Sequence, residues 1–229
     1  ATLLGTLVGP MTGNSRSLRL LGVGSGVLEV RSRLTNTNAA SVTVGGNSLV
    51  DADGKLRDLS AVVADIGPNQ LGGPGLAKLR KLKTDKLPLV KGKPRMGCPI
   101  SHISKFVAIG LNYADHAAES NLPIPKEPII FMKATSCIQG PDDDVMLPKG
   151  LKKSDWEVEL GVVIGTRARY VSQKDALNHV AGYCTINDVS EREYQIERGG
   201  TWDKGKGCDT FGPIGPWLVT RDVVPNPQN

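Results

Sequence analysis

Two apolar stretches of this chain, each with the pattern of a β-strand, carry acidic side chains. Glu157 and Glu159 lie within residues 156–165, and Asp188 directly follows residues 181–187. A carboxylate on an apolar strand is costly to bury unless a partner compensates its charge. Any fold of this chain must therefore bring such a partner to these acids, and a divalent cation is the simplest one.

The spacing of Glu157 and Glu159 favours a shared ligand. Residues i and i+2 of a strand point to the same face, with their α-carbons about 7 Å apart. Taken alone, the pair is equally consistent with a solvent-facing strand whose acids pair with Lys or Arg, but Asp188 at the end of a second strand favours a metal site. Because oxygen ligands suit hard cations, we predict that Glu157, Glu159 and Asp188 bind Mg²⁺ or Mn²⁺, with Ca²⁺ also compatible.

A second candidate pair is His116 and Glu119, three positions apart on a predicted helix. Side chains at this spacing are neighbours on a helix surface. A carboxylate beside an imidazole fixes its tautomer and raises its basicity, which makes a general base competent near neutral pH. Taken alone, however, the two residues are better explained as an incidental pair on an exposed helix.

Three further polar residues follow Asp188. Lys206 lies in a glycine-bounded loop, which can bring backbone amides and an ammonium group close to an anion, although a mobile surface loop is the alternative. Gln195 and Arg192 lie on the helix predicted after Asp188 and are further candidate site residues.

The composition favours a strand-and-turn architecture. The chain has 27 glycines and 15 prolines among 229 residues, with many short apolar runs, which is unlike a helical bundle. A hairpin is predicted around Asp53 and Gly54, and a helix from Ser190, because Ser190 and Glu193 match a capping box. Strands are predicted at 105–110, 128–133, 156–165, 181–187 and 217–220, and short helices within 59–100, after 112 or 113, and at 175–180.

The charge distribution predicts no nucleic-acid partner. The chain has a net charge of +5, and its basic residues are concentrated between Lys78 and Arg95, a region with eight basic residues and one acid. Aromatic residues that would stack on bases are absent there, whereas Leu76, Leu79 and Leu82 indicate a short helix with a solvated basic face.

No membrane association is predicted either, since no run approaches the ~18 apolar residues of a membrane span. The four cysteines are scattered and form no C-x-x-C pair, which favours a reducing, cytoplasmic location. The region 1–28 has arginines and no acid, a bias that a targeting peptide would share, but no amphipathic helix or cleavage pattern accompanies it.

Four motifs, in this order, resemble the fumarylacetoacetate hydrolase family: IGLNYADHAAE, DWEVELG, NDVSER and KGCDTFGP, at 109–119, 155–161, 187–192 and 206–213. The resemblance covers about residues 48–228. It implies an α+β, predominantly β fold, a mixed β-sandwich roll with short helices, usually as a homodimer. It also implies that Glu157, Glu159 and Asp188 bind the metal, and that His116 with Glu119 forms the catalytic dyad.

For Lys206 and Gln195 the resemblance implies contact with the oxygens of the substrate, and Arg192 is expected to bind the substrate beside Gln195. The substrate would be a small oxo acid, and the activity a metal-dependent hydrolase that cleaves a C–C bond in a 2,4-dioxo acid, such as a 2,4-dioxo-3-deoxy sugar acid. Ureidoglycolate lyase, dioate isomerase and oxaloacetate decarboxylase are alternatives within the family. Members continue beyond the point where this chain ends, through a Thr-Gly-Thr-Pro segment, so an inactive fragment that only binds metal is the alternative of another class.

Three regions are expected along the chain. Residues 1–48 are an atypical leader, for which disorder, an indistinct strand region and a wrongly read gene start are alternatives. Residues 49–100 form a small N-terminal region, and residues 101–229 form the catalytic β-roll domain, incomplete at its C-terminus.

Overall fold

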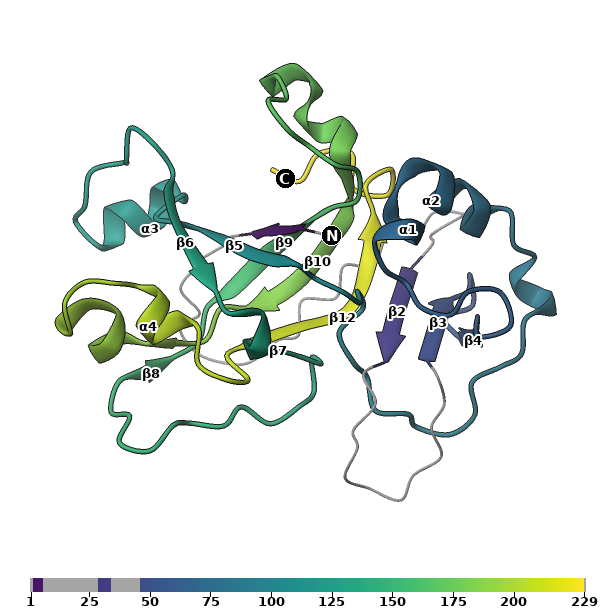
Figure 1. Cartoon of the computed structure of the whole chain (residues 1–229), viewed down its shortest axis with the longest axis horizontal. Coiled ribbons are helices and arrows are strands. Elements are labelled where there is room, and N and C mark those ends of the chain that lie inside the picture. The colour runs from purple at the N-terminus through teal and green to yellow at the C-terminus, as the bar shows by residue number, and fades with distance from the viewer. Residues whose placement is uncertain (1, 6–28, 34–45, 229) are drawn as a thin grey trace.

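A single large mixed sheet dominates the fold (Figure 1). The computed structural model describes residues 2–5, 29–33 and 46–228. Among these, ten strands form one sheet in the order β4-β3-β2-β12-β10-β9-β1-β5-β6, with β7 paired to β12, and β11 and β8 form a separate two-stranded ribbon. Strands with a few short helices confirm the predicted α+β, predominantly β class.

The strands are β1 Thr2–Gly5, β2 Glu29–Arg33, β3 Gly46–Val50, β4 Leu56–Asp58, β5 Lys105–Gly110, β6 Ile129–Lys133, β7 Ile138–Gln139, β8 Ser154–Asp155, β9 Val158–Ile164, β10 Val180–Asn187, β11 Ser190–Glu191 and β12 Gly212–Thr220. The α-helices are α1 Pro68–Leu71, α2 Gly73–Arg80, α3 Ala114–Glu119 and α4 Asp203–Lys206. Three 3₁₀ segments, Thr84–Lys86, Thr135–Cys137 and Gln173–His179, and a π-helix, Glu193–Glu197, complete the described helices.

The centre of the sheet is the antiparallel trio β9, β10 and β12. Side chains along β9 alternate between buried and half-buried positions, as the period of two in a strand requires. In the β9–β10 ladder, Glu159 lies opposite Ile186 and Val158 opposite Asn187. This register brings the start of β9 beside the end of β10, where the predicted metal-binding acids lie.

The predicted hairpin is confirmed by β3 and β4. Leu49 pairs with Arg57 and Val50 with Leu56, on either side of a tight turn. Gly54 adopts a φ of +76° in that turn, a conformation that glycine adopts without steric cost. The carboxylate of Asp51 accepts hydrogen bonds from the backbone N–H groups of Asp53 and Lys55, at 3.0 and 2.9 Å, and so closes the loop.

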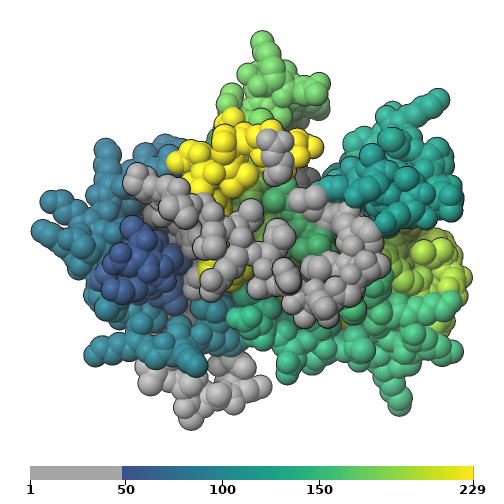
Figure 2. All heavy atoms as spheres, turned by 180° about the vertical axis from the view of Figure 1, so that it is seen from behind, coloured from purple at the N-terminus to yellow at the C-terminus, as the bar shows by residue number. Residues whose placement is uncertain are grey.

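The short basic helix is also present as α2. Its Leu76 and Leu79 are buried in the core, whereas Lys78 and Arg80 face outward. Arg80 forms an ion pair with Asp222 near the end of the chain. The yellow C-terminal residues accordingly lie beside blue-coloured residues on the face seen in Figure 2.

One local prediction was wrong. Ser190 does not cap a helix: it pairs with Asp155 in the β11–β8 ribbon, and its hydroxyl donates to the carbonyl of Asp188 at 2.9 Å. The helical turn that follows is the π-helix Glu193–Glu197. The capping-box pattern describes only local hydrogen bonds. In this structure Ser190 pairs with a distant strand instead of starting a helix.

Most of the predicted leader, residues 1–48, lies outside the described residues. The described parts of that region are strands: β1 lies between β9 and β5, and β2 between β12 and β3. The division of the chain at residues 48 and 100 remains a prediction. In the part of the chain that the structure describes, no helix has the length and apolar character needed to cross a bilayer.

Leu218 of β12 is fully buried in the core. Leu218→Ala should lower the free energy of unfolding by about 2–5 kcal/mol, because the substitution leaves a cavity. Leu177, 46% exposed on a 3₁₀ segment, provides the control: Leu177→Ala should change it by no more than about 0.5 kcal/mol. Urea unfolding measures both, and equal effects would contradict the assignment of β12 to the core.

Candidate active site

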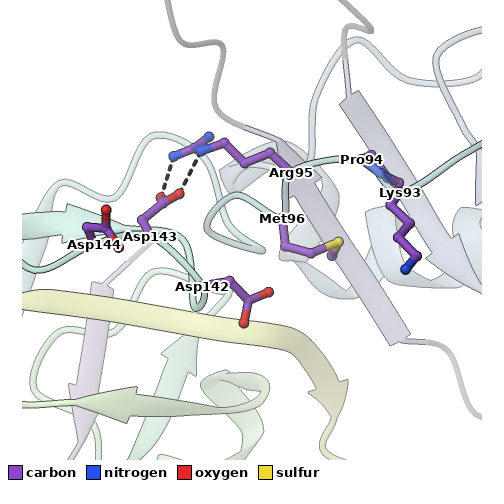
Figure 3. Close-up of a pocket in the computed structure, with 7 residues that line it drawn as sticks. All are labelled: Lys93, Pro94, Arg95, Met96, Asp142, Asp143 and Asp144. Atoms are coloured by element: carbon purple, nitrogen blue, oxygen red, sulfur yellow. Dashed lines mark hydrogen bonds and ion pairs between the residues drawn. The ribbon is translucent and has the colours of Figure 1, made fainter.

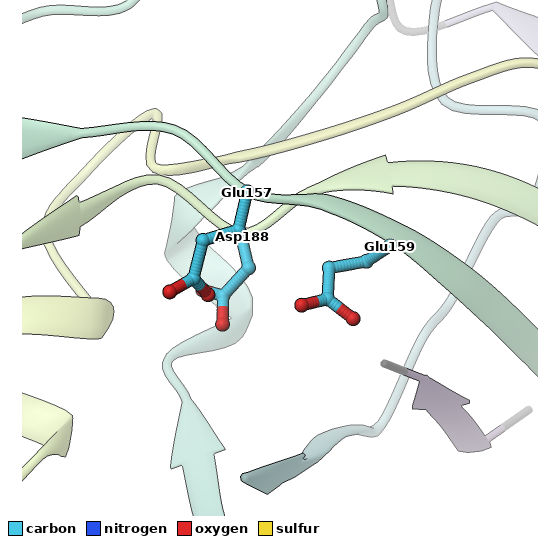
Figure 4. A group of neighbouring side chains, drawn as sticks. All are labelled: Glu157, Glu159 and Asp188. Atoms are coloured by element: carbon cyan, nitrogen blue, oxygen red, sulfur yellow. The ribbon is translucent and has the colours of Figure 1, made fainter. Parts of the chain in front are cut away.

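Three carboxylates converge at the junction of β9 and β10 (Figure 4). Glu157 immediately precedes β9, Glu159 lies within it, and Asp188 immediately follows β10. The backbone N–H of Asp188 donates to the carbonyl of Glu157 at 2.8 Å, which holds the two segments together. All three side chains are buried, and each offers a carboxylate oxygen within 4.8 Å of the others.

Two buried lysines and a partly buried arginine compensate this negative charge. The ammonium group of Lys206 lies 2.6 Å from Oε2 of Glu157 and 2.8 Å from Oδ2 of Asp188. Lys133 lies 2.6 Å from Oδ1 of Asp188, and Arg192 pairs with Oε1 of Glu157. Burial alone would raise the pKa of Asp188, but the charges of Lys133 and Lys206 outweigh it and hold that pKa below its ordinary value.

Lys206 is presented by α4, which is fastened to strand β6. The ring of Trp202 packs edge-on against Phe131, with 5.4 Å between centroids, and covers Gly110, where a Cβ would lie 2.4 Å from the Trp202 ring. The carboxylate of Asp203 accepts the backbone N–H of Met132 at 2.8 Å. These contacts explain why Lys206, the last residue of α4, is buried.

Lys204, two positions earlier on α4, is exposed, and its ammonium group donates to the carbonyl of Arg198. The short helix accounts for the difference between the two lysines, because residues two apart on a helix point in different directions.

Lys133 is a site residue that the sequence predicted as lining the core, with reach into the cleft as the alternative, and to which it assigned no role. Its side chain is fully buried, and its ammonium group donates to Oδ1 of Asp188, to the carbonyl of Val189 at 3.2 Å and to the carbonyl of Lys206. The available signal was its position on β6, where Lys133 shares the buried face with Phe131. A lysine on the core face of an apolar strand requires an acidic or carbonyl partner.

Arg192 and Gln195, which follow Asp188 closely in the sequence, lie beside the acids in the structure. The guanidinium of Arg192 donates to Oε1 of Gln195 at 3.0 Å and to Oδ2 of Asp155 at 2.8 Å, besides pairing with Glu157. Gln195 is buried within the π-helix. Their role in substrate binding remains a prediction.

The predicted dyad lies on α3, which begins four residues after β5. His116 is partly buried and Glu119 is exposed, and within the described residues no hydrogen bond joins their side chains. Burial raises the pKa of Tyr113, the residue that caps α3, and the negative charge of Glu159 raises it further. The start of α3 is thus within electrostatic range of the acids, while the pairing of His116 with Glu119 remains a prediction.

The donor set fits a divalent cation. Glu157, Glu159 and Asp188 offer only oxygen ligands, converge within 4.8 Å and come from a rigid pair of strands. Hard cations such as Mg²⁺, Mn²⁺ and Ca²⁺ favour such ligands, and the carboxylates alone do not distinguish among them.

A separate hollow of about 570 Å³ lies between residues 93–96 and 142–144 (Figure 3). The ion pair between Arg95 and Asp143 spans it, and Asp143 also accepts the N–H of Gly140 at 2.8 Å. No member of the acid group lines it. Its lining is Lys93, Pro94, Arg95, Met96, Asp142, Asp143 and Asp144. Among the described residues its carboxylates form no convergent group of three, as Glu157, Glu159 and Asp188 do, so the acid group is the better candidate for chemistry.

Lys133→Met should lower the free energy of unfolding by about 3 kcal/mol, because breaking a buried ion pair leaves Asp188 with only part of its compensation. The control is Lys204→Met on the exposed face of α4, with an expected change of no more than about 0.5 kcal/mol. Chemical denaturation compares them, and a Lys133→Met protein as stable as the control would contradict a structural role for this pair.

The lowered pKa of Asp188 also predicts an acid dependence. An acid whose pKa is lower in the folded state stabilises the fold when ionised, and this contribution is lost as the pH falls through the folded-state pKa. Below the ordinary pKa of 3.8, the stability of the native protein should therefore fall more steeply with pH than that of Asp188→Asn. Unfolding free energies measured at about pH 5 and about pH 3 give the two slopes; equal slopes would argue against the ion pairs.

Comparison with known proteins identifies relatives over most of the chain. A protein of Burkholderia lata named "Putative hydrolase" is 62% identical over 180 residues, which are 79% of this chain and 64% of that protein. A relative from Burkholderia multivorans with a similar name is 62% identical over 181 residues, with the same coverage. The chain thus spans 64% of the length of these curated relatives.

Solved structures share the fold. A fumarylacetoacetate hydrolase from Exiguobacterium antarcticum superposes with a TM-score of 0.63 at 27% identity, over 86% of this chain and 67% of that one. A 5-carboxymethyl-2-hydroxymuconate delta-isomerase from Mycobacterium smegmatis gives a TM-score of 0.55 at 28% identity, over 85% and 65%. Residues 105–229 match the family described as fumarylacetoacetate (FAA) hydrolase C-terminal, so the chain belongs to the fumarylacetoacetate hydrolase family.

Proposed function

We propose that this chain carries the active site of a metal-dependent hydrolase that cleaves a C–C bond in a 2,4-dioxo acid, such as a 2,4-dioxo-3-deoxy sugar acid. The observation that carries the proposal is the buried group Glu157, Glu159 and Asp188 with Lys206 against it. The names of the Burkholderia relatives support hydrolysis as the reaction class. Because the chain spans less than two thirds of those relatives, the activity is proposed for the whole protein.

Glu157, Glu159 and Asp188 would hold Mg²⁺ or Mn²⁺. When bound, such a cation supplies Lewis-acid stabilisation of negative charge on the oxygens of the substrate. Lys206 and Gln195 would donate hydrogen bonds to the oxyanion that forms when water adds to the distal carbonyl, since fixed donors in a buried site stabilise such charge strongly. Arg192, partly exposed beside the acids, would bind a carboxylate of the substrate through its fork of N–H donors.

His116 would take the proton from the attacking water, with Glu119 orienting its imidazole. The hydroxide adds to the carbonyl carbon at position 4, and the bond between carbons 3 and 4 then breaks. Its electron pair remains on the 2-oxo acid fragment as an enolate, which carbon protonation converts to pyruvate. The other fragment leaves as a carboxylic acid, so that one water is consumed for each bond cleaved.

The position of α3 supports this role for His116. Its first turn follows Tyr113, whose phenol lies within range of the charge of Glu159. His116 itself is only partly buried, so solvent reaches this residue.

Isomerisation of an unsaturated dioate is the second candidate. The solved neighbours include a 5-carboxymethyl-2-hydroxymuconate delta-isomerase and a 2-hydroxyhepta-2,4-diene-1,7-dioate isomerase from Mycobacterium marinum. In that reaction the same His116 would move a proton between two carbons and no water would be consumed. Release of pyruvate from a 2,4-dioxo acid therefore separates the two functions.

We also propose that the protein is a homodimer. The support is edge strand β6, where Ile130 and Met132 expose apolar side chains on the face away from the core. Such residues on an edge strand favour association.

His116→Ala should abolish pyruvate release while Mn²⁺ still binds, because the acids remain intact. Glu157→Ala should abolish both pyruvate release and Mn²⁺ binding, since it removes one of the metal ligands. It also removes one of the two carboxylates that pair with Lys206. His179→Ala, at the end of a 3₁₀ segment outside the site, is the control and should retain both. Calorimetry measures metal binding, and loss of 2,4-dioxo-acid absorbance with pyruvate release measures turnover.

Turnover retained by either His116→Ala or Glu157→Ala would contradict these assignments. Treatment with a chelator should also abolish pyruvate release, and added Mn²⁺ should restore it. If Mn²⁺ binds but no 2,4-dioxo acid is consumed, the metal site stands and the substrate class is wrong.

A further inference from the structure

Glu191 is a fully buried carboxylate that none of the proposed catalytic roles uses. Within the described residues, its hydrogen-bond partners are uncharged groups. The backbone N–H of Lys153 donates to both its oxygens, at 3.0 and 3.2 Å, the hydroxyl of Ser154 donates at 3.1 Å and the N–H of Glu193 at 3.3 Å. Burying a carboxylate is costly unless hydrogen-bond donors compensate it. The four hydrogen bonds that converge on Glu191 therefore indicate that its carboxylate is held in a specific position.

These donors belong to the two segments that border the acid group. In the ribbon, Glu191 of β11 pairs with Ser154 of β8, and the N–H of Arg192 donates to the carbonyl of Lys153 at 2.9 Å. Strand β8 ends two residues before Glu157, and β11 begins two residues after Asp188. The carboxylate of Glu191 therefore ties together the chain entering the site and the chain leaving it.

The ribbon helps to orient the side chain of Arg192. Its guanidinium contacts Oδ2 of Asp155 through Nε at 3.1 Å and Nη2 at 2.8 Å, and Oε1 of Gln195 through Nη1 at 3.0 Å. Asp155 is about half exposed, with a side-chain exposure of 47%, so its own burial does not fix it. Its position depends on the pairing of β8 with β11, which Glu191 secures from the buried side.

The acids depend less on the ribbon. Glu159 lies inside the β9–β10 ladder, and the N–H of Asp188 is bonded directly to the carbonyl of Glu157. Loosening the ribbon would thus weaken the contacts of Arg192 with Asp155, including that of its Nε–H, before it disturbs the acids, and would leave Arg192 its ion pair with Glu157.

We propose that Glu191 is a positioning residue: its buried carboxylate closes the β8–β11 ribbon and thereby holds the guanidinium of Arg192 in place to bind the anionic end of the substrate. The part that concerns the substrate rests on the function proposed above. The part that concerns Arg192 does not, because it is a statement about how one side chain is held.

The first experiment measures the order of Arg192 without any ligand. In Glu191→Leu, which keeps the size and removes the acceptors, the Nε–H of Arg192 should exchange with solvent at least about tenfold faster by nitrogen-15 NMR. Glu191→Gln, which keeps one acceptor oxygen, should give a smaller effect in the same direction and serves if the leucine variant fails to fold. The Nε–H of Arg169, which lies outside the ribbon, should not change.

The matched control is Glu197→Leu. Glu197 is exposed and pairs with the ammonium group of Lys153 rather than with its amide, so this change removes a carboxylate from the same neighbourhood without opening the ribbon. Arg192 should exchange as in the native protein. If Arg192 stays equally ordered in both Glu191 variants, the proposal is overturned, whatever the substrate.

The second experiment measures binding of pyruvate to the Mn²⁺-loaded protein. Glu191→Leu should weaken pyruvate binding by about 10–100-fold, as is usual when a supporting hydrogen bond is lost, and change Mn²⁺ affinity by no more than about twofold. Arg192→Lys should weaken pyruvate similarly, and the double variant should be no weaker than Arg192→Lys alone. Additive losses, or an equal loss of Mn²⁺ affinity, would show that Glu191 acts on the whole site and not through Arg192.

The two experiments fail separately. If the native protein binds Mn²⁺ but not pyruvate, or if Arg192→Lys binds pyruvate normally, the proposed function is wrong. The exchange rate of Arg192 still decides whether Glu191 holds it.

Discussion

The ion pairs that Lys133 and Lys206 make with buried carboxylates are the constraint on which the rest of the site depends. Glu157 and Asp188 lose hydration when the sheet forms, and the cost is recovered only if positive charge meets them at close range. Lys133 comes from β6 and Lys206 from α4. The acids therefore require β6 and α4 to lie at the β9–β10 junction, and the fold of these segments is part of the site.

The same requirement explains several packing details. Helix α4 has only four residues, too few to be stable alone, so its position depends on contacts with β5 and β6. Three contacts hold it. The ring of Trp202 covers Gly110, the carboxylate of Asp203 accepts the N–H of Met132, and the carbonyl of Lys206 accepts a hydrogen bond from the ammonium group of Lys133. A site held in this way is largely formed before a cation or substrate arrives, which lowers the cost of ordering it on binding.

Local patterns predicted the elements whose hydrogen bonds are local. The hairpin at Gly54, strands β5, β9 and β10, and helix α3 lie where periodicity and turn residues indicated. The capping box at Ser190 failed because a strand pairing with Asp155, 35 positions earlier, replaced the helix start. Lys133 was given no role at the site, because nothing within its own segment shows what a buried lysine faces.

The sequence by itself determined that acids lie at the start of one strand and at the end of another. It also determined that the motifs around these strands match those of a family with a metal-binding site. It did so because alternation along a strand and the order of motifs are properties of neighbouring residues. Only the tertiary structure decided which cation meets which acid: Lys133 reaches Asp188 across 55 positions, and Lys206 reaches Glu157 across 49. Such pairings follow from how the sheet and α4 pack, which no local pattern specifies.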